Sequence, residues 1–174
     1  MDSTATQDGS LFEKVLECYT TKSPVKLLDL YTNIYAQNAT FTDPVVCASS
    51  RVEARLQFLA LQHIFSRVNA QPKTAPTRTK DGKVKLDVHF DYYWDRTSAP
   101  MKWIVPDVTP VDCTVVLTLD PSGKIVHHED LWTTPSVPRI PMVLRSLNAY
   151  ATNAIFRVLG WESELINESP SKQD

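Results

Sequence analysis

Glycine, cysteine and long apolar runs are scarce in this chain, and each scarcity excludes a class of protein. The 174 residues include only 4 glycines, so we expect no glycine-rich loop for binding phosphate. The 3 cysteines, Cys18, Cys47 and Cys113, cannot all pair and lack the Cys-x-x-Cys spacing of metal sites. We therefore expect free thiols in a reducing compartment. No apolar run reaches the roughly 20 residues that a membrane-spanning helix needs.

The sequence also has no cluster of charges of one sign. The formal net charge is -2, and no basic cluster offers the electrostatic footprint of a nucleic-acid-binding protein. The first 10 residues lack the basic and apolar regions of a signal peptide, so we expect a disordered lead over 1–10 and a cytoplasmic protein, with entry into the nucleus left open. The 4 histidines have no metal-ligand spacing, and we expect neither a metal nor another cofactor.

What the sequence does contain is a pattern of three helices followed by strands. A hydrophobic fraction of 43% over this length is enough for one globular domain with its own core. An apolar stripe at helical spacing starts at Leu11 and reaches Tyr19. Ser23-Pro24 then predicts a second helix that ends at Gln37-Asn38. A third helix is expected over about 50–68, beginning at a serine cap.

The strands are marked by alternation and by turn residues. A short strand over 39–42 is closed by Asp43-Pro44, a pair that disfavours both helix and sheet. Asp81-Gly82 predicts a hairpin turn, and the strand after it alternates apolar and polar residues from Val84 to Trp94. Two more strands, 111–119 and 124–132, flank the turn at 120–123. Helices followed by antiparallel strands predict an α+β domain.

This order of elements, together with two segments of the sequence, resembles the nuclear transport factor 2-like superfamily. The segments are Leu30-Tyr31, Tyr35-Ala36 and Asn38–Pro44 at one end, and Gly123–Trp132 at the other. The resemblance covers residues 11–133 and implies a cone-shaped α+β barrel, in which a curved antiparallel sheet is wrapped by three N-terminal helices. The fold hosts isomerases, dehydratases, cyclases, epoxide hydrolases, transport adaptors and scaffolds, so it does not by itself fix an activity.

Resemblance to two enzymes of this superfamily implies candidate catalytic residues. Ketosteroid isomerase carries its general base in a similar Ala-Thr-x-x-Asp-Pro segment, which implies Asp43 here and places Tyr19 near that enzyme's oxyanion-donating tyrosine. The isomerase's protonated aspartate has no counterpart, because Asp112 lies on the other strand phase. Limonene epoxide hydrolase has an aspartate on its last strand, which implies Asp130, although the rest of its Asp-Arg-Asp arrangement is missing here.

Alternatives stay open both at Asp43 and on the last strand. Asp43 is either an acid or base with a pKa raised by apolar walls, or the cap of the turn before the third helix. On the last strand, His128 and Asp130 share a face with Val126 and Trp132, because side chains alternate. If that face is concave, His128 and Asp130 join Asp43 as the candidate catalytic group; if the opposite face is concave, His127 and Glu129 take their place. A third outcome is paired charges on the outer sheet face.

Aromatic residues supply the candidate ligand-binding walls. These are Tyr19, Tyr31, Tyr35, Trp94 and Trp132. Most simply they form the core, while a subset lines a cavity for a small apolar molecule. We therefore hold two hypotheses of different classes. The first is a cofactor-free isomerase, dehydratase or cyclase. The second is a non-enzymatic dimeric adaptor that uses the sheet face and the last helix, and a homodimer is expected in either case.

The end of the sequence extends beyond the minimal pattern of the superfamily. We divide it into a helical extension over 134–161, with the helix itself from Pro141 to Leu159, and a flexible tail over 162–174. Three placements of this helix stay open: over the mouth of the cone or the outer sheet face, in a dimer interface, or on a membrane surface. Few basic residues support the last of these.

Overall fold

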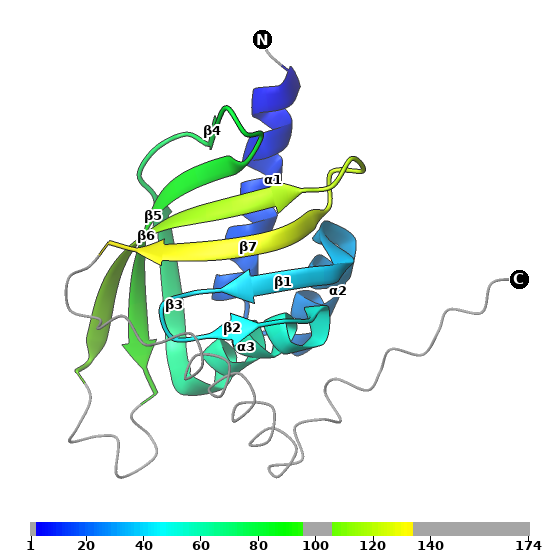
Figure 1. The fold of residues 1–174 in the computed structure, drawn as a ribbon. Helices are drawn as coiled ribbons and strands as arrows, with labels where there is room; N and C mark the ends of the chain where they lie inside the picture. The colour runs from blue at the N-terminus through cyan, green and yellow to red at the C-terminus, as the bar shows by residue number, and fades with distance from the viewer. Residues whose placement is uncertain (1–2, 96–105, 134–174) are drawn as a thin grey trace, which may run out of the picture.

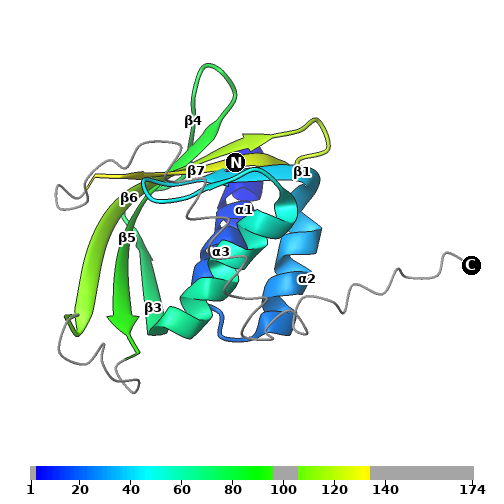
Figure 2. The same cartoon turned by 60° about the horizontal axis from the view of Figure 1, so that its bottom comes forward.

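Three helices lie inside a strongly curved sheet in the computed structural model, which describes residues 3–95 and 106–133, with side chains from residue 7 on. The helices are α1 (Ser3–Thr20), α2 (Pro24–Ile34) and α3 (Arg51–Ile64), and Figures 1 and 2 show them on one side of the sheet. The predicted α+β cone is confirmed. The C-terminal helix and tail expected from the sequence lie outside the described residues.

Within residues 3–95 and 106–133 the sheet has seven strands and is open. In chain order they are β1 (Tyr35–Thr42), β2 (Cys47–Ala48), β3 (Phe65–Pro72), β4 (Thr77–Arg78), β5 (Val84–Trp94), β6 (Val108–Leu119) and β7 (Ile125–Trp132). Their spatial order is β2-β1-β7-β6-β5-β3, with β4 also paired to β5. The sheet is mixed where an antiparallel one was expected, because β1 pairs with β7 in parallel. This pair brings the first and last described strands side by side (Figure 1).

Serine caps start α2 and α3 as the sequence predicts. The hydroxyl of Ser23 accepts from the N–H of Lys26, and that of Ser50 accepts from the N–H of Glu53. The ends differ from expectation. α2 stops at Ile34, and the chain goes straight into β1. α3 stops at Ile64 instead of about residue 68, because the following residues pair with β5 as β3, a strand that the sequence pattern did not indicate.

The first helix also begins earlier than expected. It starts at Ser3, so much of the expected disordered lead over 1–10 is helical. One reason lies in an ion pair that local sequence does not reveal. The carboxylate of Asp8 accepts two hydrogen bonds from the guanidinium of Arg78 on β4, at 2.7 and 2.6 Å. This bidentate pair anchors the N-terminal half of α1 to the sheet.

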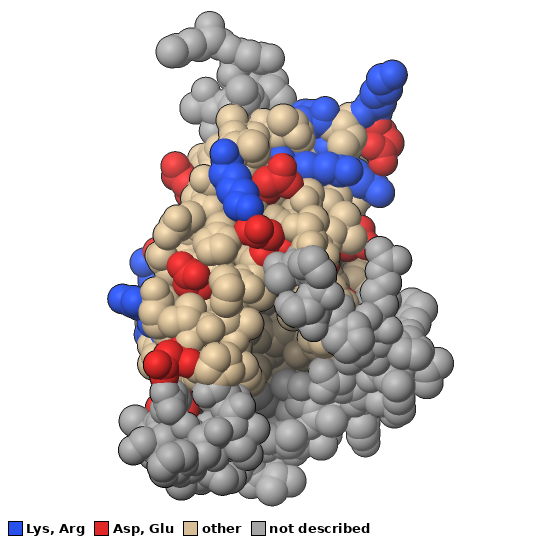
Figure 3. Space-filling view, turned by 90° about the vertical axis from the view of Figure 1, so that its left-hand side faces the viewer, with Lys and Arg blue, Asp and Glu red and all other residues tan. Residues whose placement is uncertain are grey.

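The core fills the space between the helices and the concave face of the sheet. On β5 the predicted alternation is confirmed, since Val84, Leu86, Val88, Phe90 and Tyr92 are buried. The intervening side chains form part of the outer face, where Asp112 accepts from His89 Nδ1 at 2.7 Å and contacts Lys73 Nζ at 2.6 Å. Figure 3 shows another side of the molecule, on which acidic and basic residues are interspersed. None of the three described helices has the length and hydropathy needed to cross a bilayer.

The turn between β6 and β7 sets the register of the strand that carries the candidate site. Its Gly123 has φ of +85°, in the left-handed region, and a Cβ built there would meet only Gln7 Nε2, at 3.9 Å. A substitution would therefore cost backbone strain and no steric clash. Gly9, in α1, has open space around a built Cβ and no such positive φ, which makes it a matched control.

We predict that Gly123→Ala lowers the free energy of unfolding by about 1–2 kcal/mol, because an L-residue resists the left-handed conformation. Gly9→Ala should instead raise it by about 0.5–1 kcal/mol, because alanine favours the helix. Urea denaturation followed by circular dichroism measures both. Equal stability of the Gly123→Ala variant and the wild-type protein would contradict the assigned turn.

Candidate functional site

The last strand turns His128 and Asp130 into the interior of the cone. Their exposed fractions are 0% and 5%, whereas the His127 side chain lies on the outer face and hydrogen-bonds to Thr40 Oγ1 at 2.8 Å. Alternation is broken early in β7, where the pairing with β6 shifts register and leaves both Ile125 and His128 buried. The structure therefore decides the open question of strand phase: the concave pair is His128 and Asp130.

Four buried side chains from three separate parts of the chain form one hydrogen-bonded group, which we call the Asp130 cluster: Tyr19, Tyr35, His128 and Asp130. Tyr19 on α1 donates its hydroxyl to Asp130 Oδ2 at 2.6 Å. His128 Nε2 lies 3.1 Å from Asp130 Oδ1 and 3.1 Å from the Tyr19 oxygen. At the other side of the ring, His128 Nδ1 lies 2.6 Å from the hydroxyl of Tyr35, at the start of β1.

Proton positions in the cluster follow from counting donors and acceptors. The two carboxylate oxygens of Asp130 accept from the Tyr19 O–H and the His128 Nε2–H. A neutral imidazole protonated at Nε2 then leaves Nδ1 as the acceptor for the Tyr35 O–H. In this assignment each of the four short contacts has a donor and an acceptor, without a positive charge on His128. Asp130 therefore selects the histidine tautomer, because its carboxylate can only accept from Nε2, and the Tyr35 hydroxyl satisfies the remaining Nδ1.

Aromatic rings enclose the cluster and explain the protonation of its phenols. The Tyr19 ring lies 4.8 Å from that of Phe90 and 4.9 Å from that of Phe58, and the His128 ring lies 5.1 Å from that of Phe41. Burial raises the pKa of Tyr19 well above its usual value, and the nearby charge of Asp130 raises it further. Burial likewise raises the pKa of Tyr35. Both phenols are therefore neutral hydrogen-bond donors at physiological pH.

Cys113 is a member of this environment that the sequence reasoning missed. Its thiol hydrogen-bonds to Asp130, and burial raises the thiol pKa well above its ordinary range, with further contributions from the charges of Asp130 and Asp43. The thiol therefore stays protonated and acts as a weak donor. The alternation of Val111, Cys113 and Val115 along β6 was the available signal that Cys113 points inward. All three cysteines of the chain are free thiols.

Asp43 has a clear local role in the turn after β1. Its Oδ1 accepts from the backbone N–H groups of Val45 and Val46, at 2.7 and 2.5 Å, so it caps this turn. Burial is the main cause of the raised pKa values of Tyr92 and Cys113, and the charges of Asp130 and then Asp43 raise both further. Asp43 and Asp130 therefore act on the same two side chains. A catalytic role for Asp43 stays a prediction beside the capping role.

The remaining aromatic candidates differ in their burial and in their contacts. Tyr31 stacks on Tyr35 with ring centroids 3.8 Å apart and is 1% exposed. Trp94, at the end of β5, donates its Nε1–H to Thr109 Oγ1 at 2.9 Å. Trp132, at the end of β7, is partly buried against the core. Their role in binding a ligand stays a prediction. Within the described residues, no group of three or more His, Cys, Asp or Glu could hold a metal ion.

The stacked tyrosines provide a matched test of the proton assignment. Tyr35→Phe removes the only hydroxyl bonded to His128 Nδ1 among the described residues and leaves a buried acceptor unpaired, so we predict a loss of about 1–3 kcal/mol in the free energy of unfolding. Tyr31→Phe removes a buried hydroxyl that has no hydrogen-bond partner among those residues. That change should cost less than about 0.5 kcal/mol or stabilise the protein.

Denaturant unfolding measures both variants, and nitrogen-15 NMR of the His128 ring reports its tautomer. The wild-type ring should show protonation at Nε2, and Tyr35→Phe should shift the Nδ1 signal, which loses its hydrogen bond, while Tyr31→Phe should not. Equal costs for the two substitutions, or a wild-type ring protonated at Nδ1, would contradict the assignment.

Known proteins resemble this chain in structure but not in sequence. No family model matches the chain, and no curated protein matches it. A protein from Agrobacterium tumefaciens named as an isomerase of the SnoaL-like family aligns with a TM-score of 0.58 and 15% identity, over 74% of this chain and 99% of its own. An NTF2-like protein of unknown function from Exiguobacterium aligns with a TM-score of 0.58 and 11% identity, over 70% of this chain and 97% of its own.

A third similar structure is SalBIII, an epoxide hydrolase/cyclase-like enzyme in pyran ring formation of the polyether salinomycin. It aligns with a TM-score of 0.52 and 20% identity, over 72% of this chain and 92% of its own. At such identities the likeness concerns the fold alone. Together with the three helices enclosed by a curved, open sheet, these alignments show that the chain has the nuclear transport factor 2-like cone fold.

Proposed function

We propose that this protein is a cofactor-free enzyme that moves a proton on a small, largely apolar molecule, as an isomerase, dehydratase or cyclase. The observation that carries this proposal is the Asp130 cluster, in which a carboxylate and an imidazole meet inside the cone, enclosed by aromatic rings. Candidate catalytic residues are Asp130 and His128, with Asp43 as a second carboxylate that acts on the same surroundings.

The energetic cost of the cluster supports a chemical role over a purely structural one. Transfer of a carboxylate into an apolar interior is unfavourable unless several hydrogen bonds compensate for lost water. Buried ionic groups can often be replaced by apolar residues of similar volume without loss of stability. A cone that only needed a core would therefore gain little from Asp130 and His128. Titratable groups with fixed orientations in an apolar setting are typical of acid–base sites.

The geometry suggests a division of roles. Asp130, held by three donors, is the base that takes a proton from the substrate. Tyr19 stays neutral and is the hydroxyl that donates toward developing negative charge on a substrate oxygen. His128 orients Asp130, and the hydroxyl of Tyr35 holds the other side of the His128 ring. The same carboxyl group then returns its proton to another atom of the substrate, so the cycle needs no oxidant and no metal.

Similar structures favour this class of reaction without fixing the substrate. One similar protein is named as an isomerase, and another is described as epoxide hydrolase/cyclase-like and acts in ring formation. Both types of reaction combine a base with a hydrogen-bond donor to oxygen. A small apolar ligand also agrees with the aromatic walls formed by Tyr19, Phe41, Phe58 and Phe90.

The adaptor hypothesis has less support in the described residues. Its sheet-face contact would need an apolar outer surface, but the outer side of β5 and β6 carries His89, Asp91 and Asp112. Exposed large apolar residues are dispersed over α2, α3 and β7: Val25, Val52, Ile64 and Leu131. Homodimer formation and a cytoplasmic location stay predictions.

We predict that the wild-type protein accelerates at least one of two probe reactions: conjugation of the double bond in cyclohex-3-enone, or ring opening of cyclohexene oxide. Asp130→Asn should reduce the rate at least 100-fold, because loss of a general base typically costs 10²–10⁴-fold. Ultraviolet absorbance follows the enone, and gas chromatography follows the diol.

Two further variants separate chemistry from folding. Asp112→Asn makes the same substitution on the outer face of the sheet and should leave the rate unchanged. Tyr19→Phe keeps the ring packed against Phe58 and Phe90 and should lower kcat more than it raises KM. Wild-type rates in a folded Asp130→Asn variant, or no acceleration of either reaction by the wild-type protein, would contradict the proposal.

A further inference from the structure

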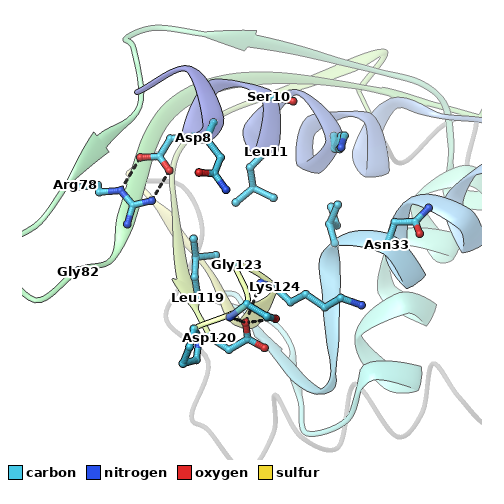
Figure 4. Close-up of a pocket in the computed structure, with 15 residues that line it drawn as sticks. Asp8, Ser10, Leu11, Asn33, Arg78, Gly82, Leu119, Asp120, Gly123 and Lys124 are labelled. Carbon is cyan, nitrogen blue, oxygen red and sulfur yellow. Dashed lines mark hydrogen bonds and ion pairs between the residues drawn. The ribbon is translucent and has the colours of Figure 1, made fainter. Parts of the chain in front are cut away.

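A second concave site lies at the end of the cone that carries the β4–β5 and β6–β7 turns. It is a groove with a volume of about 1030 Å³, lined by one face of α1, the end of α2, the β6–β7 turn, and Arg78 and Gly82 at the β4–β5 hairpin. Figure 4 shows α1 on one side and the segment from Leu119 to Lys124 on the other. No member of the Asp130 cluster lines this groove.

The charges in the groove leave two lysines without a partner carboxylate among the described residues. Asp8 and Arg78 neutralise each other through their bidentate pair. Asp120 is occupied by its own turn, where one carboxylate oxygen accepts from the hydroxyl of Ser122 and from the N–H groups of Ser122 and Lys124, and these bonds keep its pKa below the usual value. Lys14 and Lys124 remain, on opposite walls, and Lys124 Nζ has only a 3.5 Å contact with the carbonyl of Thr32.

The groove is also apolar where the walls meet. Leu11 of α1, Ile34 at the end of α2 and Leu119 at the end of β6 line it between the polar groups. Its shape is preset by bonds that need no ligand, since the Asp8–Arg78 pair fixes α1 to β4 and the hydrogen bonds of Asp120 fix the turn. A preformed concavity that combines apolar walls with a few polar groups is typical of small-molecule sites.

We propose that this groove binds a small organic anion with an apolar body, of the carboxylate or phosphate-ester class. The apolar part would contact Leu11, Ile34 and Leu119, and the anionic group would lie between the ammonium groups of Lys14 and Lys124. Opposite charge from two walls favours an anion over a neutral or cationic molecule of the same size. The site is independent of the proton-transfer function proposed for the interior of the cone.

Octanoate and octyl phosphate are suitable probes, with octanol as the uncharged comparison and inorganic phosphate as the anion without an apolar body. Each is titrated into the full chain and followed by nitrogen-15 NMR. We expect the two organic anions to shift the amide signals of Ser10, Gly82, Gly123 and Lys124. The relative affinities of octanoate and octyl phosphate then distinguish the two sources of the anion. Octanol and inorganic phosphate should each bind at least tenfold more weakly than the better anion.

A double variant tests the role of the lysines. Lys14→Gln with Lys124→Gln should weaken binding of the better anion about tenfold, and raised salt should weaken wild-type binding in the same direction. Lys80→Gln with Lys85→Gln changes the net charge equally at positions that do not line the groove, and should have little effect. Ser10→Trp places a large ring at an exposed position of α1 that lines the groove, and should block binding without disturbing the core.

The outcomes separate this site from the one inside the cone. Asp130→Asn should leave binding of the organic anions unchanged, whatever it does to the probe reactions. Shifts confined to the amides near Tyr19 and His128, equal binding of octanol and octanoate, or full binding by the double lysine variant would each overturn the proposal.

Discussion

The Asp130 carboxylate is the group on which the organisation of the cone interior depends. It accepts from a tyrosine of the first helix, from a histidine of its own strand and from a thiol of the neighbouring strand. Because an uncompensated carboxylate in this setting is costly, the three donors must be held in place by the fold. Helix α1, strand β1 and the β6–β7 hairpin are therefore tied to one another through a polar contact inside an aromatic core.

How well this arrangement could be predicted from the sequence depends on how far apart in the chain the interacting residues lie. Features set by neighbouring residues were predicted well: the serine caps at Ser23 and Ser50, the turns at Gly82 and Gly123, and the alternation along β5. Features set by distant partners were not. The first residues of β3 were predicted as the end of a helix because Phe65 and Val68 suit either periodicity, and only pairing with β5 makes them part of a strand.

The candidate site shows the same contrast between features set by neighbouring residues and features set by distant ones. The alternation of side chains alone could not decide whether His128 and Asp130 or His127 and Glu129 point inward. A register irregularity early in β7 determines which side chains face the interior. Tyr35 was named as a ligand-binding aromatic, yet its clearest contact is with His128, 93 positions away in the chain. Asp43, the first candidate for a base, is engaged in capping its own turn. Side-chain roles of this kind depend on geometry that no local pattern encodes.

The parallel pairing of β1 with β7 has a consequence for how the protein folds during synthesis. β1 is complete at residue 42, but its partner in the sheet spans 125–132, so the edge of β1 that pairs with β7 stays open until most of the domain has been made. The hydroxyls of Tyr19 and Tyr35 also lack their partners, Asp130 and His128, until this segment has been synthesised. Contacts at such sequence separation slow folding and leave strand edges exposed on the way. The nascent chain is therefore most prone to aggregation shortly before its last described strand emerges.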